Sequence, residues 1–323
     1  MRKTLLRPAA VSLVLACALA APQVRADKYP YKPVRIIQGF SIGGISDTLA
    51  RMIGDKLGAR LGQPIVVEAH PGAGGIVGMS YVSESAPDGY TLLLGNSAIT
   101  IMANRKERLP FDPMKTFVPV SMIGTAPSVL LAHASLPVES IADLIAYAKA
   151  RPGKVDCATS GVGTTNDLGV HLLNYMAKIQ ISTVPYKGSG PSIIAALSNE
   201  TSLSFSPLLP AIPHVKSGRL KALGMSSERR NPALPKVPAI AETVPGYEAV
   251  GFFSIVAHRS VPRQVVELLH RHINEILEMP DMQERLVEQG LEVKVMTRAA
   301  FAEFMLRDAE RWKNLVTQAH VVF

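Results

Sequence analysis

The sequence predicts an α/β protein of two lobes, because one arrangement of strand, glycine turn and helix occurs twice along the chain. The first turn reads Phe40-Ser-Ile-Gly-Gly-Ile-Ser-Asp47, and the second reads Thr159-Ser-Gly-Val-Gly-Thr-Thr-Asn-Asp167. Each turn joins a short β-type run to a helical pattern. Such units pair their strands in parallel and cover the sheet with helices. We therefore expect mixed, mainly parallel sheets flanked by helices in two lobes.

The N-terminal residues have the three regions of a secretory signal peptide. Basic residues at positions 2, 3 and 7 precede an apolar stretch from Ala9 to Ala21, and Val24-Arg-Ala26 then offers a cleavage site. This stretch is shorter than the roughly 20 apolar residues that span a bilayer. We expect residues 1–26 to be removed on export. Val14-Leu-Ala-Cys17 also resembles a lipoprotein signal, so lipid attachment at Cys17 is the alternative.

The first block after the leader has the order strand, helix, strand, strand. Its β-type runs lie at residues 34–39, 65–68 and 90–94, and the apolar face of its helix is formed by Leu49, Met52, Ile53, Leu57 and Leu61. Gly62 ends this helix, and Pro87-Asp-Gly89 makes the turn before the third strand. That strand ends at Gly95-Asn96-Ser97.

The second block repeats this plan with strands at 155–159, 181–185, 203–206 and 220–225. Its first helix has Leu168, Leu172, Tyr175 and Met176 on one face, and Thr164 and Asp167 have the spacing of a capping box. Helices lined by residues 265–276 and 301–316 follow, with a strand at 291–295. Because this last segment has no glycine turn of its own, we expect it to complete lobe 1. The predicted domains are 27–124 with 248–323 for lobe 1 and 125–247 for lobe 2.

The two glycine turns have the chemistry of an anion-binding site. Each leaves a strand on residues without a Cβ and enters a helix through a Ser or Thr cap, so backbone N–H groups and the helix dipole face outward. A micromolar receptor needs about 8 kcal/mol, and a hydrogen bond to a charged group supplies roughly 1.5 to 3, so several donors must converge. The candidates for ligand binding are Ser41, Gly43, Gly44, Ser46, Asn96 and Ser97 from lobe 1, and Ser160, Gly163, Thr164, Thr165 and Ser206, with Tyr186 at the rim, from lobe 2.

Other functions have less support in the sequence. Taken singly, Ser46 and Thr164 are also explained as helix caps, and the glycines as turn residues. Removing the leader lowers the formal net charge from +8 to +4, and aromatic residues make up 6% of the chain, so nucleic acid is not an expected partner. Cys157 is alone in the mature chain, and His270 and His272 point in different directions on a helix, so no disulfide and no metal site are expected. Gly72-Ala-Gly-Gly-Ile-Val-Gly78 lacks the dinucleotide spacing, so no cofactor is predicted.

The chain resembles the Bug-type receptors of tripartite tricarboxylate transporters along nearly its whole mature length. The segments that carry this resemblance are Pro33-Val-Arg-Ile-Ile37, Gly43–Asp47, Gly62–Glu68, Pro71–Gly75, Pro87–Gly95, Leu109–Pro113, Val184–Pro191 and Pro245–Glu248. The resemblance implies a two-lobed periplasmic binding protein of type 2, the Venus-flytrap architecture. It implies a receptor that closes over a small mono-, di- or tricarboxylate and passes it to integral-membrane permease subunits. Independently of the resemblance, a monomer is the default expectation, and no enzymatic activity is expected because no nucleophile has a marked base partner.

Three departures from the family pattern bear on the ligand. Asn166-Asp167 places a carboxylate near the proposed anion, unless Asp167 points back to cap its helix, which is the favoured interpretation. Ser206 stands where amino-acid-binding members tend to carry Asp, so an amino acid is disfavoured. Ser41-Ile42 replaces two prolines of the first turn. Two alternative functions stay open, namely a sensory co-receptor that presents the carboxylate to a membrane sensor kinase and a secreted serine hydrolase.

Overall fold

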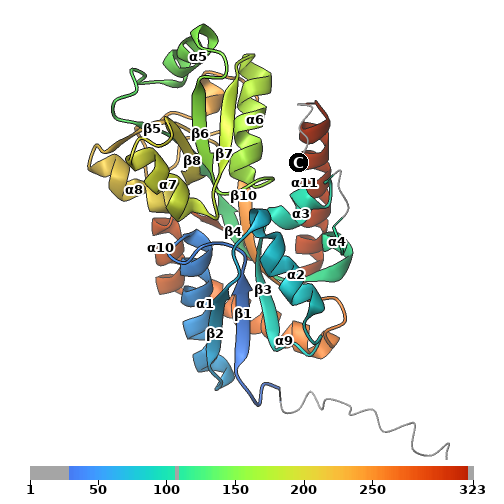
Figure 1. The fold of residues 1–323 in the computed structure, drawn as a ribbon. Coiled ribbons are helices and arrows are strands. Elements are labelled where there is room, and N and C mark those ends of the chain that lie inside the picture. The colour runs from blue at the N-terminus through green and yellow to red at the C-terminus, as the bar shows by residue number, and fades with distance from the viewer. Residues whose placement is uncertain (1–28, 106–108, 319–323) are drawn as a thin grey trace, which may run out of the picture.

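Two β-sheets lie end to end in the computed structural model, which describes residues 29–105 and 109–318 (Figure 1). The six-stranded sheet has the order β11-β4-β10-β3-β1-β2 and the five-stranded sheet has the order β7-β6-β8-β5-β9. We call the part built on the six-stranded sheet lobe 1 and the part built on the five-stranded sheet lobe 2. Both are flanked by helices, so the predicted α/β fold of two lobes is confirmed.

The strands of lobe 1 are β1 (Val34–Gln38), β2 (Ile65–Ala69), β3 (Thr91–Asn96), β4 (Phe117–Ala126), β10 (Gly251–His258) and β11 (Glu292–Val293). Its helices are α1 (Ile45–Leu61), α2 (Ile76–Glu84), α3 (Ala98–Met102), α4 (Pro113–Thr116), α9 (Arg263–Leu277), α10 (Pro280–Glu288) and α11 (Arg298–Gln318), with a 3-10 turn at Ala73–Gly75. Val34, Ile36 and the helical residues Leu49, Ile53 and Leu57 are fully buried together, as the helical and strand periodicities predict.

The strands of lobe 2 are β5 (Ser128–His133), β6 (Val155–Thr159), β7 (Ile181–Pro185), β8 (Leu203–Pro207) and β9 (Leu220–Met225). Its helices are α5 (Ile141–Ala150), α6 (Thr165–Ala177), α7 (Ser189–Leu197) and α8 (Leu208–Lys216), with a 3-10 turn at Ile240–Glu242. The lone Cys157 is a fully buried residue of β6. Leu168 and Leu173 of α6 pack into the same core as Phe205 of β8.

The prediction of mainly parallel pairing was wrong, because antiparallel pairs outnumber parallel ones among the described strands. β1 pairs in parallel with β2 and β3, and β6 pairs in parallel with β7 and β8. β10 is antiparallel to β3 and β4, β11 to β4, and β5 to β8 and β9. The antiparallel strands include those next to the crossings between the lobes, where the chain leaves one sheet and returns.

The two crossings are hydrogen-bonded to each other. β4 ends at Ala126 and β5 begins at Ser128. After β9 the chain forms a further segment of lobe 2 and comes back beside Ser226 at Ala249, whose N–H donates to the Ser226 carbonyl at 2.9 Å just before β10. The N–H of Ser128 donates to the Ser226 hydroxyl at 2.7 Å, and the N–H of Ser226 donates to the Ser128 carbonyl at 2.8 Å. These bonds place both crossings side by side. The limits of the lobes as folding units, at 27–124 with 248–323 and at 125–247, stay a prediction.

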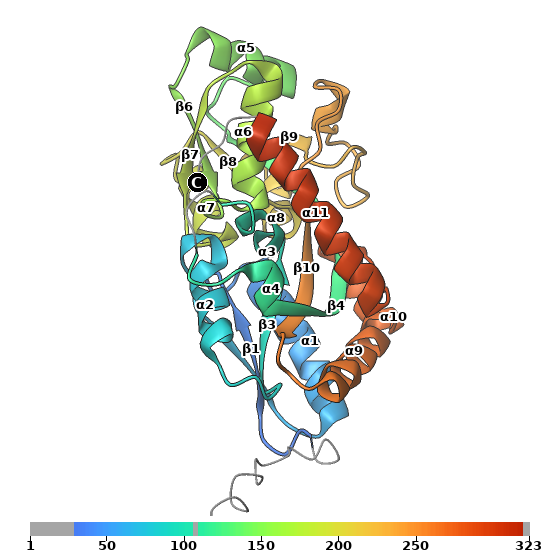
Figure 2. The ribbon, with the colours of Figure 1, turned by 90° about the vertical axis from the view of Figure 1, so that its right-hand side faces the viewer.

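Helix α11 packs against both lobes. The predicted assignment of 248–323 to lobe 1 did not anticipate its contacts with lobe 2. Phe301 and Met305 pack into a core of lobe 1, whereas the fully buried Trp312 packs into the main core of lobe 2. Between them, the Asp308 carboxylate accepts a 2.6 Å hydrogen bond from Thr100. Arg311 donates to Asp308 at 2.9 Å and to the Val250 carbonyl at 2.8 Å. Figure 2 shows α11 running along one side of the molecule from α10 to the level of α6.

The predicted signal peptide at 1–26, with Cys17, lies outside the described residues. Within residues 29–105 and 109–318, no helix has the length and apolar character needed to cross a membrane.

Candidate ligand-binding site

The first glycine turn leads from β1 into α1 and leaves the start of that helix without a side-chain cap. Gly44 is the N-cap residue, and Ser46 lies within the first helical turn, so the prediction of a Ser cap at this helix was wrong. Gly43 has a φ of 80°, and its N–H donates to the Asp47 carboxylate at 3.2 Å. The N–H groups in the first helical turn of α1 have no acceptor within the helix, and no side chain of the N-cap residue accepts from them. Helix α1 therefore offers free donors.

The second glycine turn leads from β6 into α6 and is held by a buried carboxylate. Thr164 is the N-cap residue as predicted, and its hydroxyl accepts from the Asp167 N–H at 3.4 Å. The Asp167 carboxylate accepts from the Gly163 N–H at 3.0 Å and from the Thr159 hydroxyl at 3.3 Å. Asp167 thus points back to the turn. In a full capping box its carboxylate would accept from the N–H of the N-cap residue Thr164, whereas here it accepts from Gly163, one residue earlier. Both turns share this device, because Asp47 and Asp167 each follow their glycine by four residues.

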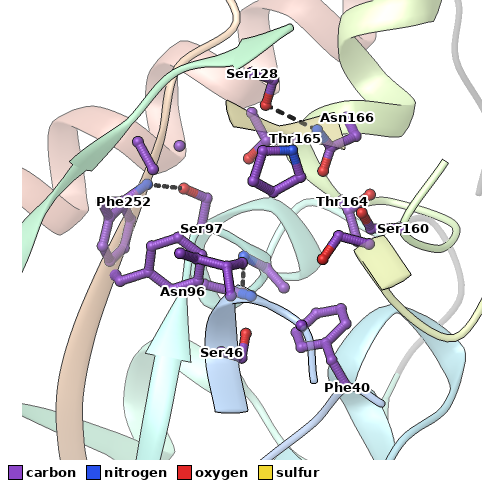
Figure 3. A pocket seen from close by; sticks show the side chains of 18 residues that line it. Phe40, Ser46, Asn96, Ser97, Ser128, Ser160, Thr164, Thr165, Asn166 and Phe252 are labelled. Carbon is purple, nitrogen blue, oxygen red and sulfur yellow. Dashed lines mark hydrogen bonds between the residues drawn. The ribbon is translucent and has the colours of Figure 1, made fainter. Parts of the chain in front are cut away.

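A cavity of about 50 Å³ lies where the two turns meet, between the lobes (Figure 3). Seven of the predicted residues line it, namely Gly44, Ser46, Asn96, Ser97, Ser160, Thr164 and Thr165. Helices α1, α6 and α7 all begin at this cavity, since Gly44, Thr165 and Ser189 are among its lining residues. Among the described residues that line it, none carries a charge. The positive ends of helix dipoles are therefore the main source of positive potential.

Five predicted residues lie outside the cavity. The Asp carboxylates take the N–H groups of Gly43 and Gly163, so these amides are not directed at the cavity. Ser41 donates its N–H and its hydroxyl to the Lys187 carbonyl, at 2.8 and 2.7 Å. Ser206 is fully buried in β8, and because side chains alternate along a strand, its neighbour Pro207 lines the cavity instead. Tyr186, proposed at the rim, donates to Glu200 at 2.8 Å.

Several lining residues were not predicted. The Asn166 side chain donates to the Ser128 hydroxyl at 2.8 Å, and Ser189 begins α7. Asn166 and Ser189 stand in segments that the sequence had marked, the second turn and the motif Val184–Pro191. Ser128 follows a crossing and has no local pattern that could have identified it. The apolar walls come from Phe40, Ile45, Ala98, Ala126, Pro207, Phe252 and Phe253, and Figure 3 shows Phe40 and Phe252 on opposite sides of the polar groups.

The hydroxyl of Ser160 is the polar group of the cavity that most needs a partner. It is buried and forms no hydrogen bond with the described residues. Two other lining side chains are already engaged within lobe 1, since the Ser97 hydroxyl accepts from the Phe252 N–H at 2.8 Å and the Asn96 side chain accepts from the Ala98 N–H at 2.9 Å. Ser97 and Asn96 therefore also fix the floor of the cavity, whereas Ser160 is free to bind a ligand. A buried polar group without a partner is costly.

The cavity has the chemistry of a binding site. Its described lining residues include no His, Asp, Glu, Lys or Cys, so no serine there has a side-chain base to activate it. Within the described part of the chain, no group of three His, Cys, Asp or Glu residues could hold a metal ion. What the arrangement offers is a set of N–H and hydroxyl donors in a space with apolar walls.

The buried Asp167 predicts a pH dependence of stability. Burial raises the pKa of this carboxyl above its ordinary value of 3.8, against the opposing effects of the Gly163 N–H and of His171. A carboxyl with a raised pKa in the folded state stabilises the protein most below its unfolded pKa, and this contribution is lost as the pH rises through the folded pKa. Asp167→Asn keeps an oxygen for the Gly163 N–H but cannot ionise.

We therefore expect the free energy of unfolding of Asp167→Asn, relative to the wild type, to increase as the pH rises from about 4 to about 7. Urea unfolding at several pH values measures this difference. A difference that stays constant over the whole range would contradict the role assigned to the buried carboxyl.

Comparison with known proteins agrees with this geometry. Residues 49–321 match the family described as "Tripartite tricarboxylate transporter family receptor". Protein BugT of Bordetella pertussis is 34% identical over 313 residues, which cover 96% of each chain. The solved structure "R. palustris Rpa4515 with adipate" superposes with a TM-score of 0.88 at 31% identity, covering 91% of this chain and 99% of that one. Periplasmic binding protein BugD superposes with a TM-score of 0.87 at 28% identity, covering 91% and 99%. The resemblance seen in the sequence is confirmed, and this chain belongs to the tripartite tricarboxylate transporter receptor family.

Proposed function

We propose that this protein is a periplasmic receptor that captures a small organic carboxylate between its lobes and delivers it to a tripartite tricarboxylate-type membrane permease. The observation that carries the proposal is a cavity between the lobes where α1, α6 and α7 begin, with the unpartnered Ser160 hydroxyl in its wall. Helix N-termini favour anions, and their N–H groups suit carboxylate oxygens. The R. palustris relative with adipate supports a carboxylate as the ligand.

The cavity also restricts the kind of carboxylate. Because no acidic side chain lines the described cavity, an ammonium group would lose its hydration without gaining a counter-ion. Amino acids are therefore poor ligands. The apolar walls of Phe40, Phe252 and Phe253 suit a hydrocarbon segment next to the carboxylate.

The experiment that tests this function is a thermal-shift screen of the purified mature protein against mono-, di- and tricarboxylates, with the corresponding amides and amino acids as controls. A ligand that binds only the folded state raises the melting temperature. At a concentration of one hundred times its Kd, it adds about 2.7 kcal/mol to the free energy of unfolding. We expect carboxylates to raise it and their amides to have no effect. If none of the acids changed the melting temperature at millimolar concentration, the proposal would be rejected.

Ser160→Ala tests whether the cavity is the site. The hydroxyl forms no hydrogen bond with described residues, so its removal breaks no internal contact. A hydrogen bond to a charged ligand contributes about 1.5 to 3 kcal/mol, so we expect the Kd to rise roughly tenfold or more without a loss of stability. Isothermal titration calorimetry measures this change.

Ser204→Ala is the matched control for that variant. Its hydroxyl is also buried without a partner among the described residues, but it lies in β8 away from the cavity. An equal loss of affinity in both variants would show that the effect is general, and would remove Ser160 from the site.

A further inference from the structure

A second hollow, far larger than the first, lies on lobe 1 and shares none of its lining residues with the ligand cavity. It is a groove of about 880 Å³ between the start of β4, the segment after β10, helix α9 and the start of α11. Figure 2 shows these elements on one side of the molecule. Because the groove belongs to lobe 1 alone, a partner could occupy it without covering the cavity between the lobes.

The groove combines an apolar floor with an excess of positive charge. Its apolar lining residues are Met114, Phe117, Val118, Pro119, Val261, Val266, Met305 and Leu306. Leu306 is 63% exposed, which is high for a leucine. Among its described lining residues, three carry guanidinium groups, namely Arg259, Arg263 and Arg298, and one, Glu267, carries a carboxylate.

The positive charges stand where the helices make them unfavourable. Arg263 is the first residue of α9 and Arg298 the first residue of α11, at the positive ends of both helix dipoles. Arg263 pairs with Glu267. Arg298 donates its Nε to the Pro119 carbonyl at 3.0 Å, but no carboxylate among the described residues forms an ion pair with Arg298 or Arg259. Burial lowers the pKa of Arg298, the carboxylate of Glu267 opposes this effect, and the nearby Arg263 adds a smaller lowering.

His270 does not change this balance. It lines the groove, and its Nδ1 is 2.7 Å from the Val120 carbonyl and 3.3 Å from the Ser121 hydroxyl. It therefore adds no negative charge to the groove. An incoming group with carboxylates would relieve the excess, because guanidinium binds carboxylate by paired hydrogen bonds.

We propose that this groove docks an acidic polypeptide segment of the membrane permease, with carboxylates on Arg259 and Arg298 and apolar side chains on the floor. The proposal rests on the proposed function, since it names the surface through which the receptor meets its permease. A polypeptide fits better than a small anion, because the groove has a volume of about 880 Å³ and apolar residues such as Phe117 and Leu306 line it beside the arginines.

The test is photo-crosslinking in cells that express the receptor with its permease and take up the carboxylate found in the thermal-shift screen. A benzophenone amino acid replaces Leu306 in the groove, and as a control it replaces Val287, which is 54% exposed on α10. We expect a crosslink to a permease subunit from position 306 and none from position 287. Uptake without a crosslink from position 306 would overturn the docking proposal, whereas absence of uptake would reject the proposed function and the docking proposal with it.

A double variant tests the charges. Arg259→Ala with Arg298→Ala is expected to lower the crosslinked fraction at least about tenfold, since charged pairs at an interface each contribute a measurable share of affinity. Arg271→Ala with Arg285→Ala, two exposed arginines of α9 and α10 outside the groove, is the matched control. The carboxylate-induced rise in melting temperature should stay the same in both. An equal loss of crosslinking in both double variants, or binding to phosphatidylglycerol vesicles that depends on Arg259 and Arg298 in place of the crosslink, would overturn the proposal.

Discussion

Gly74→Ala is expected to weaken carboxylate binding at least about tenfold, because it prevents the lobes from closing. Gly74 lies in the 3-10 turn before α2 of lobe 1, and a Cβ built on it would overlap the carbonyl oxygen of Val162 in the second glycine turn. The overlap exists only while the lobes are together. If the population of the closed state falls by some factor, the apparent affinity falls by that factor. In the open state the ligand also lacks the hydrogen-bond donors of lobe 2. Calorimetric titration measures the Kd, and small-angle scattering measures the change in shape.

Gly62→Ala is a closely matched control for the backbone. Gly62 has φ 65° and ψ 20°, and Gly74 has φ 65° and ψ 21°, so both variants place an alanine in the same left-handed conformation. Nothing lies within 4 Å of a Cβ at Gly62. Each variant should therefore lose about 1 to 2 kcal/mol of stability from backbone strain, but only Gly74→Ala should lose affinity. Equal Kd values for the two variants would show that contact between Gly74 and Val162 is not needed for binding.

Trp312→Ala is expected to lower the free energy of unfolding by about 3 to 5 kcal/mol, the usual cost of removing a large buried aromatic side chain. Trp312 is fully buried in the core of lobe 2 although its helix begins in lobe 1. The loss should therefore extend to lobe 2, whose core has no other side chain of comparable size from α11. Because Trp312 is the single tryptophan, urea unfolding is followed by circular dichroism.

Leu306→Ala provides the comparison on the same helix. Leu306 is 63% exposed, so its removal should change the free energy of unfolding by no more than about 0.5 kcal/mol. If Trp312→Ala cost as little as Leu306→Ala, the C-terminal half of α11 would not be part of the core of lobe 2.

The candidate site shows where sequence reasoning succeeds and where it stops. The glycine turns, their strands and their helices follow from local patterns, so Gly44, Ser46, Ser160, Thr164 and Thr165 were predicted and line one cavity. Gly43 and Gly163 were predicted by the same reasoning and lie outside it. Their N–H groups donate to Asp47 and Asp167. For Asp167 the sequence left open whether the carboxylate faces the ligand or points back to cap its helix, with the second favoured, and it indicated nothing for Asp47. Only the folded geometry distinguishes these two positions.

The two α/β units, the helix starts that suit an anion and the family can all be inferred from the sequence, because each depends on local spacing and on short contiguous segments. Which donors remain free, how Ser128 and Phe252 reach the cavity and why Trp312 packs in lobe 2 are visible only in the folded chain. These features depend on contacts between residues far apart in the chain, such as those of α11 with both sheets and of Gly74 with Val162. Such contacts follow from how whole elements pack, and no local pattern encodes them.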